Sequence, residues 1–287
     1  MPGDAAQALG DAPRDRDHRR PVTRSPGPRG GDDETTSPGP GPSSGSLPRG
    51  TSRAKASGAA GPAGGGGYVD YATCPTGSSA AEFIPKTTSL SVLREAVNGC
   101  RGCALYCNAT HGVFGEGPKG ARVVFVGEQP GDQEDRAGKP FVGPAGRVLD
   151  EALEAAGISR DEAYVTNAVK HFKWEPRGTR RLHARPSARE VGACRPWLET
   201  ELSIVKPKMV VCLGATAAQA LMGPAFRITK QRGEVFADTR RAPWLMATVH
   251  PSAILRIPEA GLRERARADF IDDLRRAAKQ LRLEKSR

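Results

Sequence analysis

Three polar side chains stand where apolar runs of the sequence come to an end. Glu128 follows the run 123–126 and Gly127, Asn167 closes the run 163–167, and His250 follows the run 245–249. In parallel α/β sheets, ligands bind beside the carboxyl ends of the strands. We therefore expect a carboxylate, an amide and an imidazole to meet at one sheet edge, where they can bind and react with a polar ligand. For the segment around Glu128 alone, a strand that ends in a polar turn is an equally good interpretation.

A second set of reactive residues is the cysteines. Cys100 and Cys103 form a C-x-x-C pair, which is typical of a redox site, a zinc site or an iron–sulfur cluster. A redox pair would normally open a helix after a strand, and this one does not. Cys194 is the third candidate ligand, and the fourth is either Cys107 or His171.

Strand and helix patterns alternate after residue 120 and would position these residues. Apolar runs predict strands at 123–126, 163–167, 209–213 and 245–249. A helix is predicted after each of the four runs: a capping box at 187–190 opens the second, and the third is a short helix that runs through Leu221. The pattern predicts an α/β fold with three layers (α/β/α) and a central, mainly parallel four-stranded sheet. Cys212 lies inside the third strand and is expected to be a small core residue.

Composition divides the chain into three parts. Residues 1–67 are rich in Pro, Gly, Ser and Arg, with almost no large apolar residues, so we predict a disordered tail. Residues 68–88 are interpreted as a linker, in which Cys74 has no expected role. Residues 89–287 would form one domain.

The domain is basic. The tail holds nine basic and seven acidic residues, so the rest of the chain has +9 of the net charge of +11. This charge favours a nucleic-acid partner, although a basic surface without a partner is also common. The N-terminus lacks the apolar core of a signal peptide, and no run is long enough to span a membrane. We expect a monomer in the cytoplasm of a bacterial cell, where disulfides are rare.

Together, these motifs resemble those of the iron–sulfur uracil-DNA glycosylases, the family-four branch of that superfamily. The resemblance covers roughly residues 89–282. The matching pieces are Cys100-x-x-Cys103, Gly127-Glu128-Gln129-Pro130-Gly131, Lys139-Pro140-Phe141-Val142-Gly143, Thr166-Asn167, Cys194 and His250-Pro251-Ser252.

The resemblance implies a role for each strand-end residue. Asn167 would hydrogen-bond the edge of a flipped uracil, and Phe141 would stack on the base, unless it is only a core residue. His250 would donate a hydrogen bond to the departing uracil anion, and Glu128 would stabilise the cationic sugar or orient its attacker. The residues expected to bind the substrate are Gln129, Gly131, Phe141, Asn167 and Arg181, the first two through backbone N–H groups.

One segment departs from the family-four pattern. His171 stands where those enzymes have a cysteine, and a longer basic loop, 177–183, follows. Both features resemble the UdgX subgroup, which has a Lys-Arg-Arg-Ile-His loop and attaches covalently to uracil-containing DNA through the loop histidine. Thr179 and Leu182 replace the Lys and Ile of that loop, and the histidine corresponds to His183.

The resemblance leaves three functional hypotheses open. In the first, which we favour, His183 attacks the sugar and the enzyme reacts once. In the second, Glu128 activates water in a glycosylase that turns over, and in the third the protein binds uracil-containing DNA without catalysis. The preferred partner would be single-stranded uracil-containing DNA.

The remaining site residues are expected to bind DNA or a cofactor. Arg180 and Arg181 would contact phosphates, and Ser252 and Arg256 would contact DNA near an apolar wedge at 254–255, which could equally be core. The expected cofactor is a [4Fe–4S] cluster with a structural role and the ligands Cys100, Cys103, His171 and Cys194.

Overall fold

The computed structural model describes residues 67–237 and 240–285. Apart from Gly67, the predicted disordered tail lies outside these described residues. Among them, no helix combines the length and the apolar character needed to cross a membrane.

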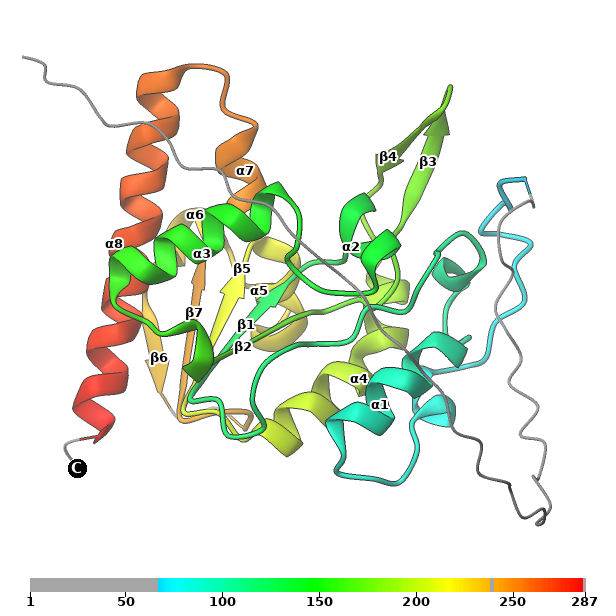
Figure 1. Ribbon diagram of the computed structural model, residues 1–287, viewed down its shortest axis with the longest axis horizontal. Coiled ribbons are helices and arrows are strands. Elements are labelled where there is room, and N and C mark those ends of the chain that lie inside the picture. The colour runs from blue at the N-terminus through cyan, green and yellow to red at the C-terminus, as the bar shows by residue number, and fades with distance from the viewer. Residues whose placement is uncertain (1–66, 238–239, 286–287) are drawn as a thin grey trace, which may run out of the picture. The chain divides into compact units, whose positions relative to one another are not determined.

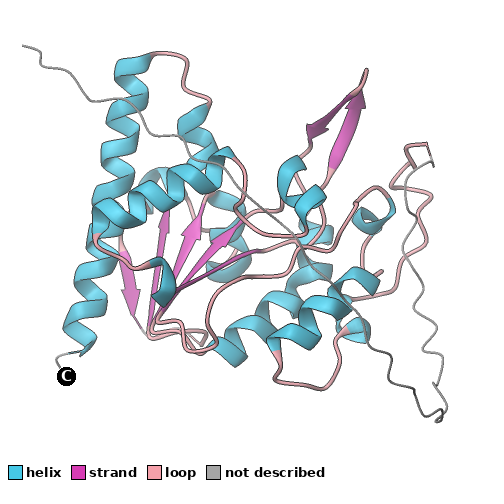
Figure 2. Ribbon diagram, in the orientation of Figure 1, coloured by secondary structure: helices cyan, strands magenta, loops and turns pink. Residues whose placement is uncertain are grey.

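A mainly parallel sheet forms the centre of the domain (Figures 1 and 2). Within the described residues it has five strands in the order β2-β1-β5-β7-β6. The strands are β1 (Val123–Gly127), β2 (Ala163–Asn167), β5 (Met209–Leu213), β6 (Val235–Ala237) and β7 (Trp244–Thr248). The four predicted strands pair in parallel, which confirms the predicted fold class. The unpredicted β6 is a three-residue edge strand that pairs antiparallel with β7.

Helices cover both faces of the sheet, which explains why its central strands are mostly apolar. Val123 and Phe125 pack toward α3 (Pro144–Ala156) and α8 (Ala260–Lys285), whereas Val124 and Val126 pack toward α4 (Ala188–Val205) and α5 (Ala215–Met222). All four side chains of β1 are at most 1% exposed. Burial of each contributes about 1.5–3 kcal/mol to the stability of the fold. Cys212 is fully buried among the second set, as predicted.

Shorter elements complete the domain. The helices are α1 (Leu90–Ala96), α2 (Asp132–Ala137), α6 (Ile228–Gln231) and α7 (Pro251–Leu255), and the 3-10 turns are η1 (Ala80–Phe83), η2 (Val97–Gly99), η3 (Ala104–Cys107) and η4 (Arg160–Glu162). A third apolar cluster joins the segment before β1 to α4 and contains Cys100, Cys103 and Cys194.

The basic loop at 177–183 is part of an antiparallel hairpin, formed by β3 (Trp174–Arg177) and β4 (Arg180–His183). Figure 1 shows this hairpin projecting beside α2, apart from the central sheet. The strands are joined by Gly178 and Thr179, and Gly178 has a φ of +59°, which a glycine adopts without a steric penalty.

Residues 68–88 are packed on the domain, so their interpretation as a linker was wrong. Ala80 in this segment is only 1% exposed. Cys74, which was expected to have no role, forms a disulfide with Cys107. Aromatic residues of the segment contact the domain, and Tyr71 forms two hydrogen bonds with the backbone of Trp174. The overall composition of the segment does not predict these contacts.

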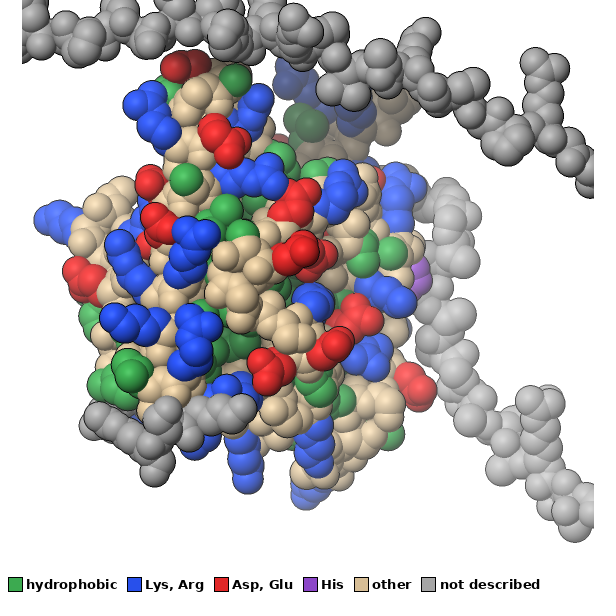
Figure 3. Space-filling view, turned by 60° about the vertical axis from the view of Figure 1, so that its left-hand side comes forward, with side chains coloured by type: hydrophobic (Ala, Val, Ile, Leu, Met, Phe, Trp, Pro, Cys, Tyr) green, Lys and Arg blue, Asp and Glu red, His purple; other side chains and the backbone are tan. Residues whose placement is uncertain are grey.

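Charges on the α8 side of the molecule are mixed. Figure 3 shows basic and acidic side chains interspersed on this face. Several are paired, including Arg275 with Asp272 and Arg276 with Asp273. This face therefore lacks a continuous positive surface for a polyanion.

Candidate active site

The carboxyl ends of the parallel strands open into a cavity of about 640 Å³. The three predicted strand-end residues, Glu128, Asn167 and His250, all line it. Phe141 and His183 line it as well, so the structure brings together residues from five separate segments. A cavity of this size fits a small organic group.

One wall of the cavity is built around Gly127, the last residue of β1. A Cβ atom at this position would lie 2.3 Å from Asn167 Oδ1, 2.9 Å from Phe141 Cζ and 3.4 Å from His250 Nε2. An amide, an aromatic ring and an imidazole therefore converge on a single point. The glycine is required because any side chain would displace these groups.

Phe141 occupies a backbone conformation that is unusual for a non-glycine residue, with a φ of +56°. Its carbonyl lies so close to Gly146 that a Cβ there would be 1.8 Å from the Phe141 oxygen. The ring lies at 25° to that of His250, with centroids 6.2 Å apart. Such strain is maintained by surrounding contacts and is common at ligand sites.

Glu134 in α2 fixes the turns on either side of this ring. Its carboxylate accepts hydrogen bonds from the backbone N–H groups of Gly143 at 2.8 Å and Gly131 at 3.1 Å. The Gly131 N–H was expected to stabilise the substrate, but in this structure it donates to Glu134. Gly131 still lines the cavity.

Asn167 is anchored through its backbone by a buried ion pair. Lys170 Nζ lies 2.5 Å from Glu201 Oε2, and both side chains are at most 1% exposed. The same ammonium donates to Asn167 O and to Thr166 Oγ1, each at 2.7 Å. Loss of one partner from such a pair leaves an uncompensated buried charge, which makes this anchor rigid.

His250 is held as a hydrogen-bond donor toward the cavity. Its Nδ1 accepts the backbone N–H of Ser252 at 3.1 Å, so the proton of the neutral ring belongs on Nε2. Burial lowers the pKa of His250 to about 4, and the neighbouring Arg256 and His183 act in the same direction. The hydroxyl of Ser252, which was predicted to contact DNA, also lies 2.8 Å from Nδ1.

Glu128 and His183 face each other across the cavity mouth. His183 Nε2 lies 3.6 Å from Glu128 Oε1, while the other carboxylate oxygen accepts a hydrogen bond from Thr216. The His183 side chain is 49% exposed. Desolvation lowers its pKa despite the opposing effect of Glu128, so the ring is neutral at pH 7.

Arg181 fastens the hairpin that presents His183. Its guanidinium binds Asp132 at 2.5 Å and Asp135 at 2.6 Å, and it lies over the rings of Phe172 and Trp174. With only 13% of its side chain exposed, Arg181 connects β4 to α2. These two carboxylates bind the guanidinium that was predicted to contact the substrate or a phosphate.

Gln129 closes the base of the same hairpin. Its Nε2 donates to Lys173 O and Ala184 O, and its Oε1 accepts the N–H of Lys173. The predicted substrate contact was through the backbone, and the side chain is used to hold the two hairpin ends together.

Exposed arginines lie at the rim. Arg180 is exposed in the hairpin, and Arg256 is exposed at the cavity edge after α7, so both can contact a phosphate backbone. Of the proposed wedge, Ile254 is 3% exposed and belongs to the core, whereas Leu255 is 43% exposed.

Comparison with known proteins agrees with this geometry. The family model described as the uracil DNA glycosylase superfamily matches residues 114–275, more than half of the chain. The chain belongs to the uracil-DNA glycosylase superfamily.

The curated relatives of this superfamily member include type-4 uracil-DNA glycosylases. The protein from Thermotoga maritima is 39% identical over 168 residues, which cover 58% of this chain and 83% of its own length. The protein from Sulfurisphaera tokodaii is 37% identical over 189 residues (63% of this chain, 82% of its own). The protein from Archaeoglobus fulgidus is 36% identical over 188 residues, which cover 63% of this chain and 90% of its own length.

Three of the four candidate cluster ligands of this superfamily member lie in one apolar cluster. Cys100, Cys103 and Cys194 are free, are at most 8% exposed and belong to one apolar cluster. His171 is 3% exposed, and its Nδ1 has no hydrogen-bond partner among the described residues. No three His, Cys, Asp or Glu side chains in the described part of the chain converge closely enough to hold a single metal ion.

In their chemistry, three buried thiols and one imidazole fit the ligand set of an iron–sulfur cluster. Burial raises the pKa of the Cys100 and Cys194 thiols, and raises that of Cys103 to about 11. Thiols in such surroundings become thiolates only when they bind a metal. Cys107 is bonded to Cys74, so of the two candidates for the fourth ligand only His171 is free.

Sequence reasoning missed several residues of the site. Thr216, Glu134, Lys170 and Arg185 were not assigned roles, although all but Lys170 line the cavity. Thr216 follows the end of β5, and that position is the signal that could have identified it. Nothing in the local sequence around Lys170 predicts its pairing with Glu201, 31 residues away.

Proposed function

We propose that the protein removes uracil from DNA and stays covalently attached to the deoxyribose through His183. The observation that supports this proposal best is the placement of a neutral imidazole 3.6 Å from Glu128, beside the Asn167, Phe141 and His250 wall. The similarity to type-4 uracil-DNA glycosylases supports uracil as the base and the N-glycosidic bond as the bond that breaks.

Recognition would use the wall around Gly127. A flipped uracil presents alternating acceptors and a donor, which the Asn167 amide matches, and Phe141 stacks on the ring. Cytosine presents the opposite pattern and would leave buried polar groups unpaired.

Bond cleavage would use the three remaining groups. The unprotonated nitrogen of His183 attacks C1′ as the bond from C1′ to N1 breaks, and the electron pair leaves with uracil. The N–H at His250 Nε2 donates to a uracil carbonyl oxygen and stabilises the anion. Glu128 stabilises the positive sugar and then the imidazolium, which loses its N–H proton to Glu128 or to water. The resulting N-alkylated imidazole is a poor leaving group, so the adduct persists.

A [4Fe–4S] cluster held by Cys100, Cys103, Cys194 and His171 would be structural in this scheme. The cluster would link the segment before β1 to α4 and to His171. No step of the bond cleavage requires it.

The test is a denaturing gel with uracil-containing single-stranded DNA. We expect wild-type protein to give a heat- and SDS-resistant shifted band and one equivalent of free uracil, and His183→Ala to give no shifted band. Leu182→Ala is the matched control, since it removes an exposed side chain from the neighbouring position of β4.

Each alternative function has its own outcome. Repeated uracil release by wild-type protein without a shifted band would replace our proposal with a glycosylase in which Glu128 activates water. Binding without released uracil would leave a noncatalytic DNA-binding protein. Duplex DNA in parallel tests the single-strand preference, because flipping a base out of a stack costs energy.

A further inference from the structure

The segment that precedes η1 contacts the hairpin of His183. The Tyr71 hydroxyl accepts the backbone N–H of Trp174 and donates to the Trp174 carbonyl oxygen, both at 3.1 Å. One side chain therefore satisfies both backbone groups of the first residue of β3. Such paired contacts fix the position and direction of the strand.

Trp174 is the cross-strand partner of His183. In the antiparallel register, Trp174 pairs with His183 at the open end of the hairpin. A shift of the Trp174 backbone is therefore transmitted to His183. Tyr71 thus lies one strand away from the imidazole that faces Glu128.

Ring contacts reinforce this arrangement. Tyr68 meets Trp174 edge-on with centroids 5.1 Å apart, and the Arg181 guanidinium lies over the Trp174 ring, 5.5 Å from its centroid. The Trp174 Nε1 donates to Asn108 O at 2.8 Å. The side chain of Asn108 in turn accepts the backbone N–H of Val69 at 2.9 Å through Oδ1 and donates to the Val69 carbonyl oxygen at 2.8 Å through Nδ2.

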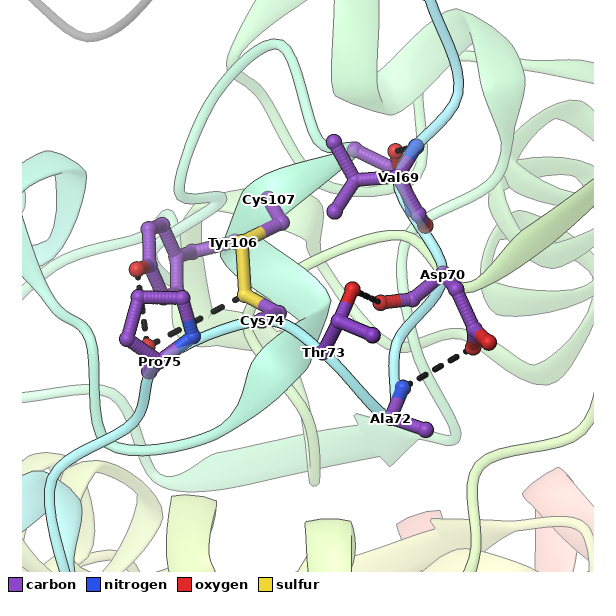
Figure 4. The surroundings of a disulfide bond; sticks show 9 residues. Val69, Asp70, Ala72, Thr73, Cys74, Pro75, Tyr106 and Cys107 are labelled. Carbon is purple, nitrogen blue, oxygen red and sulfur yellow. Dashed lines mark hydrogen bonds between the residues drawn. A yellow bond between two sulfur atoms is a disulfide. The ribbon is translucent and has the colours of Figure 1, made fainter.

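A disulfide fastens the same segment to the domain. Cys74 is bonded to Cys107, which precedes Asn108, and Figure 4 shows this bond beside Val69 and Asp70. The Tyr106 hydroxyl also donates to Pro75 O at 2.8 Å. The segment is therefore attached on both sides of Tyr71, through Val69 and through Cys74.

We propose that residues 68–74 act as a clamp that holds the His183 hairpin over the cavity, and that Tyr71 is its positioning residue. The inference rests on the proposed covalent role of His183. None of the clamp residues lines the cavity, so loosening the clamp should slow the attack without changing base recognition.

The experiment compares Tyr71→Phe with Tyr68→Phe in the full chain. Tyr71→Phe keeps the ring and removes both hydrogen bonds to Trp174. Tyr68→Phe is the matched control, since its hydroxyl hydrogen-bonds to none of the described residues while its ring contacts remain. We expect Tyr71→Phe to form the adduct about tenfold more slowly in a single turnover, with unchanged DNA affinity, and Tyr68→Phe to match wild type.

Two further measurements separate the possible failures. The double variant Cys74→Ser with Cys107→Ser should also slow adduct formation while keeping the iron content of wild type. Hydrogen exchange across residues 174–183 should be faster in Tyr71→Phe than in wild type, and this readout does not depend on an adduct.

The outcomes are distinguishable. If wild type forms an adduct and Tyr71→Phe forms it at the same rate, the positioning role is overturned while the proposed function stands. If wild type forms no adduct, the proposed function fails, and exchange still tests the clamp. Unchanged exchange at 174–183 overturns the clamp in either case.

Discussion

Replacement of Gly127 by alanine tests the base pocket with the smallest possible change. The new Cβ would lie 2.3 Å from Asn167 Oδ1, and real contacts of this kind stay beyond 3.0 Å. The amide must therefore withdraw by about 0.7 Å, and the Phe141 ring must move as well. Misplacement of a reacting or binding group by about 1 Å can cost about 100-fold in rate, so we expect Gly127→Ala to lower the rate of uracil release about 100-fold.

The fold should tolerate the substitution. Gly127 ends a strand without a positive φ, and the displaced side chains border a cavity. Gly192→Ala is the matched control, because a Cβ at this position of α4 has no neighbour within 4 Å. Alanine there favours the helix by about 0.5–1 kcal/mol and should leave activity unchanged.

The assay is a single turnover on a labelled uracil-containing single strand, with released uracil and shifted band measured together. Thermal unfolding of each variant checks that the fold is kept. Gly127→Ala protein that unfolds at the wild-type temperature and releases uracil at the wild-type rate would refute the convergence of Asn167, Phe141 and His250 on the base.

Four other predictions address the remaining parts of the site. The adduct rate should be highest above neutral pH and should fall as the pH drops through the lowered pKa of His183, since only the neutral ring attacks. His250, with a pKa of about 4, stays neutral over most of this range, so residual uracil release by His183→Ala should persist to about pH 4. Arg181→Ala leaves a buried carboxylate unpaired and should lower the free energy of unfolding by about 3 kcal/mol, measured by urea titration. Thr216→Val removes a hydrogen bond to a carboxylate and should slow the reaction about tenfold in the single-turnover assay, with unchanged DNA affinity. Cys100→Ala should lose iron and the visible iron–sulfur absorbance, whereas zinc in a colourless wild-type protein would contradict the cluster.

The sheet could be predicted because its strands are buried on both faces. The runs at 123–126 and 209–213 are apolar without interruption, and only a sheet covered by helices on both sides buries such runs. The edge strand β6 has three residues, two of them half-buried and one exposed, and so leaves no comparable pattern. The hairpin was missed because β3 and β4 are mostly exposed and contain Pro176, which indicates a loop.

The positions of the strand-end residues could also be predicted, because a parallel sheet brings the carboxyl ends of its strands to one edge. The groups that hold these residues in place could not be predicted. Arg181 is bound by carboxylates 46 and 49 residues away, and Lys170 by one 31 residues away. Sequence spacing carries no information about such pairs. From the sequence alone, the arginines of the basic loop could only be predicted to contact phosphates.

Glu128 occupies the same position whichever of the three functional hypotheses holds. Its position therefore does not distinguish between them. Thr216 binds one of its oxygens, which leaves the other directed toward the cavity mouth and His183. If the hairpin were absent, a water molecule could take the place of the imidazole beside that oxygen. The choice between turnover and a permanent adduct therefore depends less on the carboxylate than on how firmly Arg181 and Tyr71 hold β3 and β4 in place.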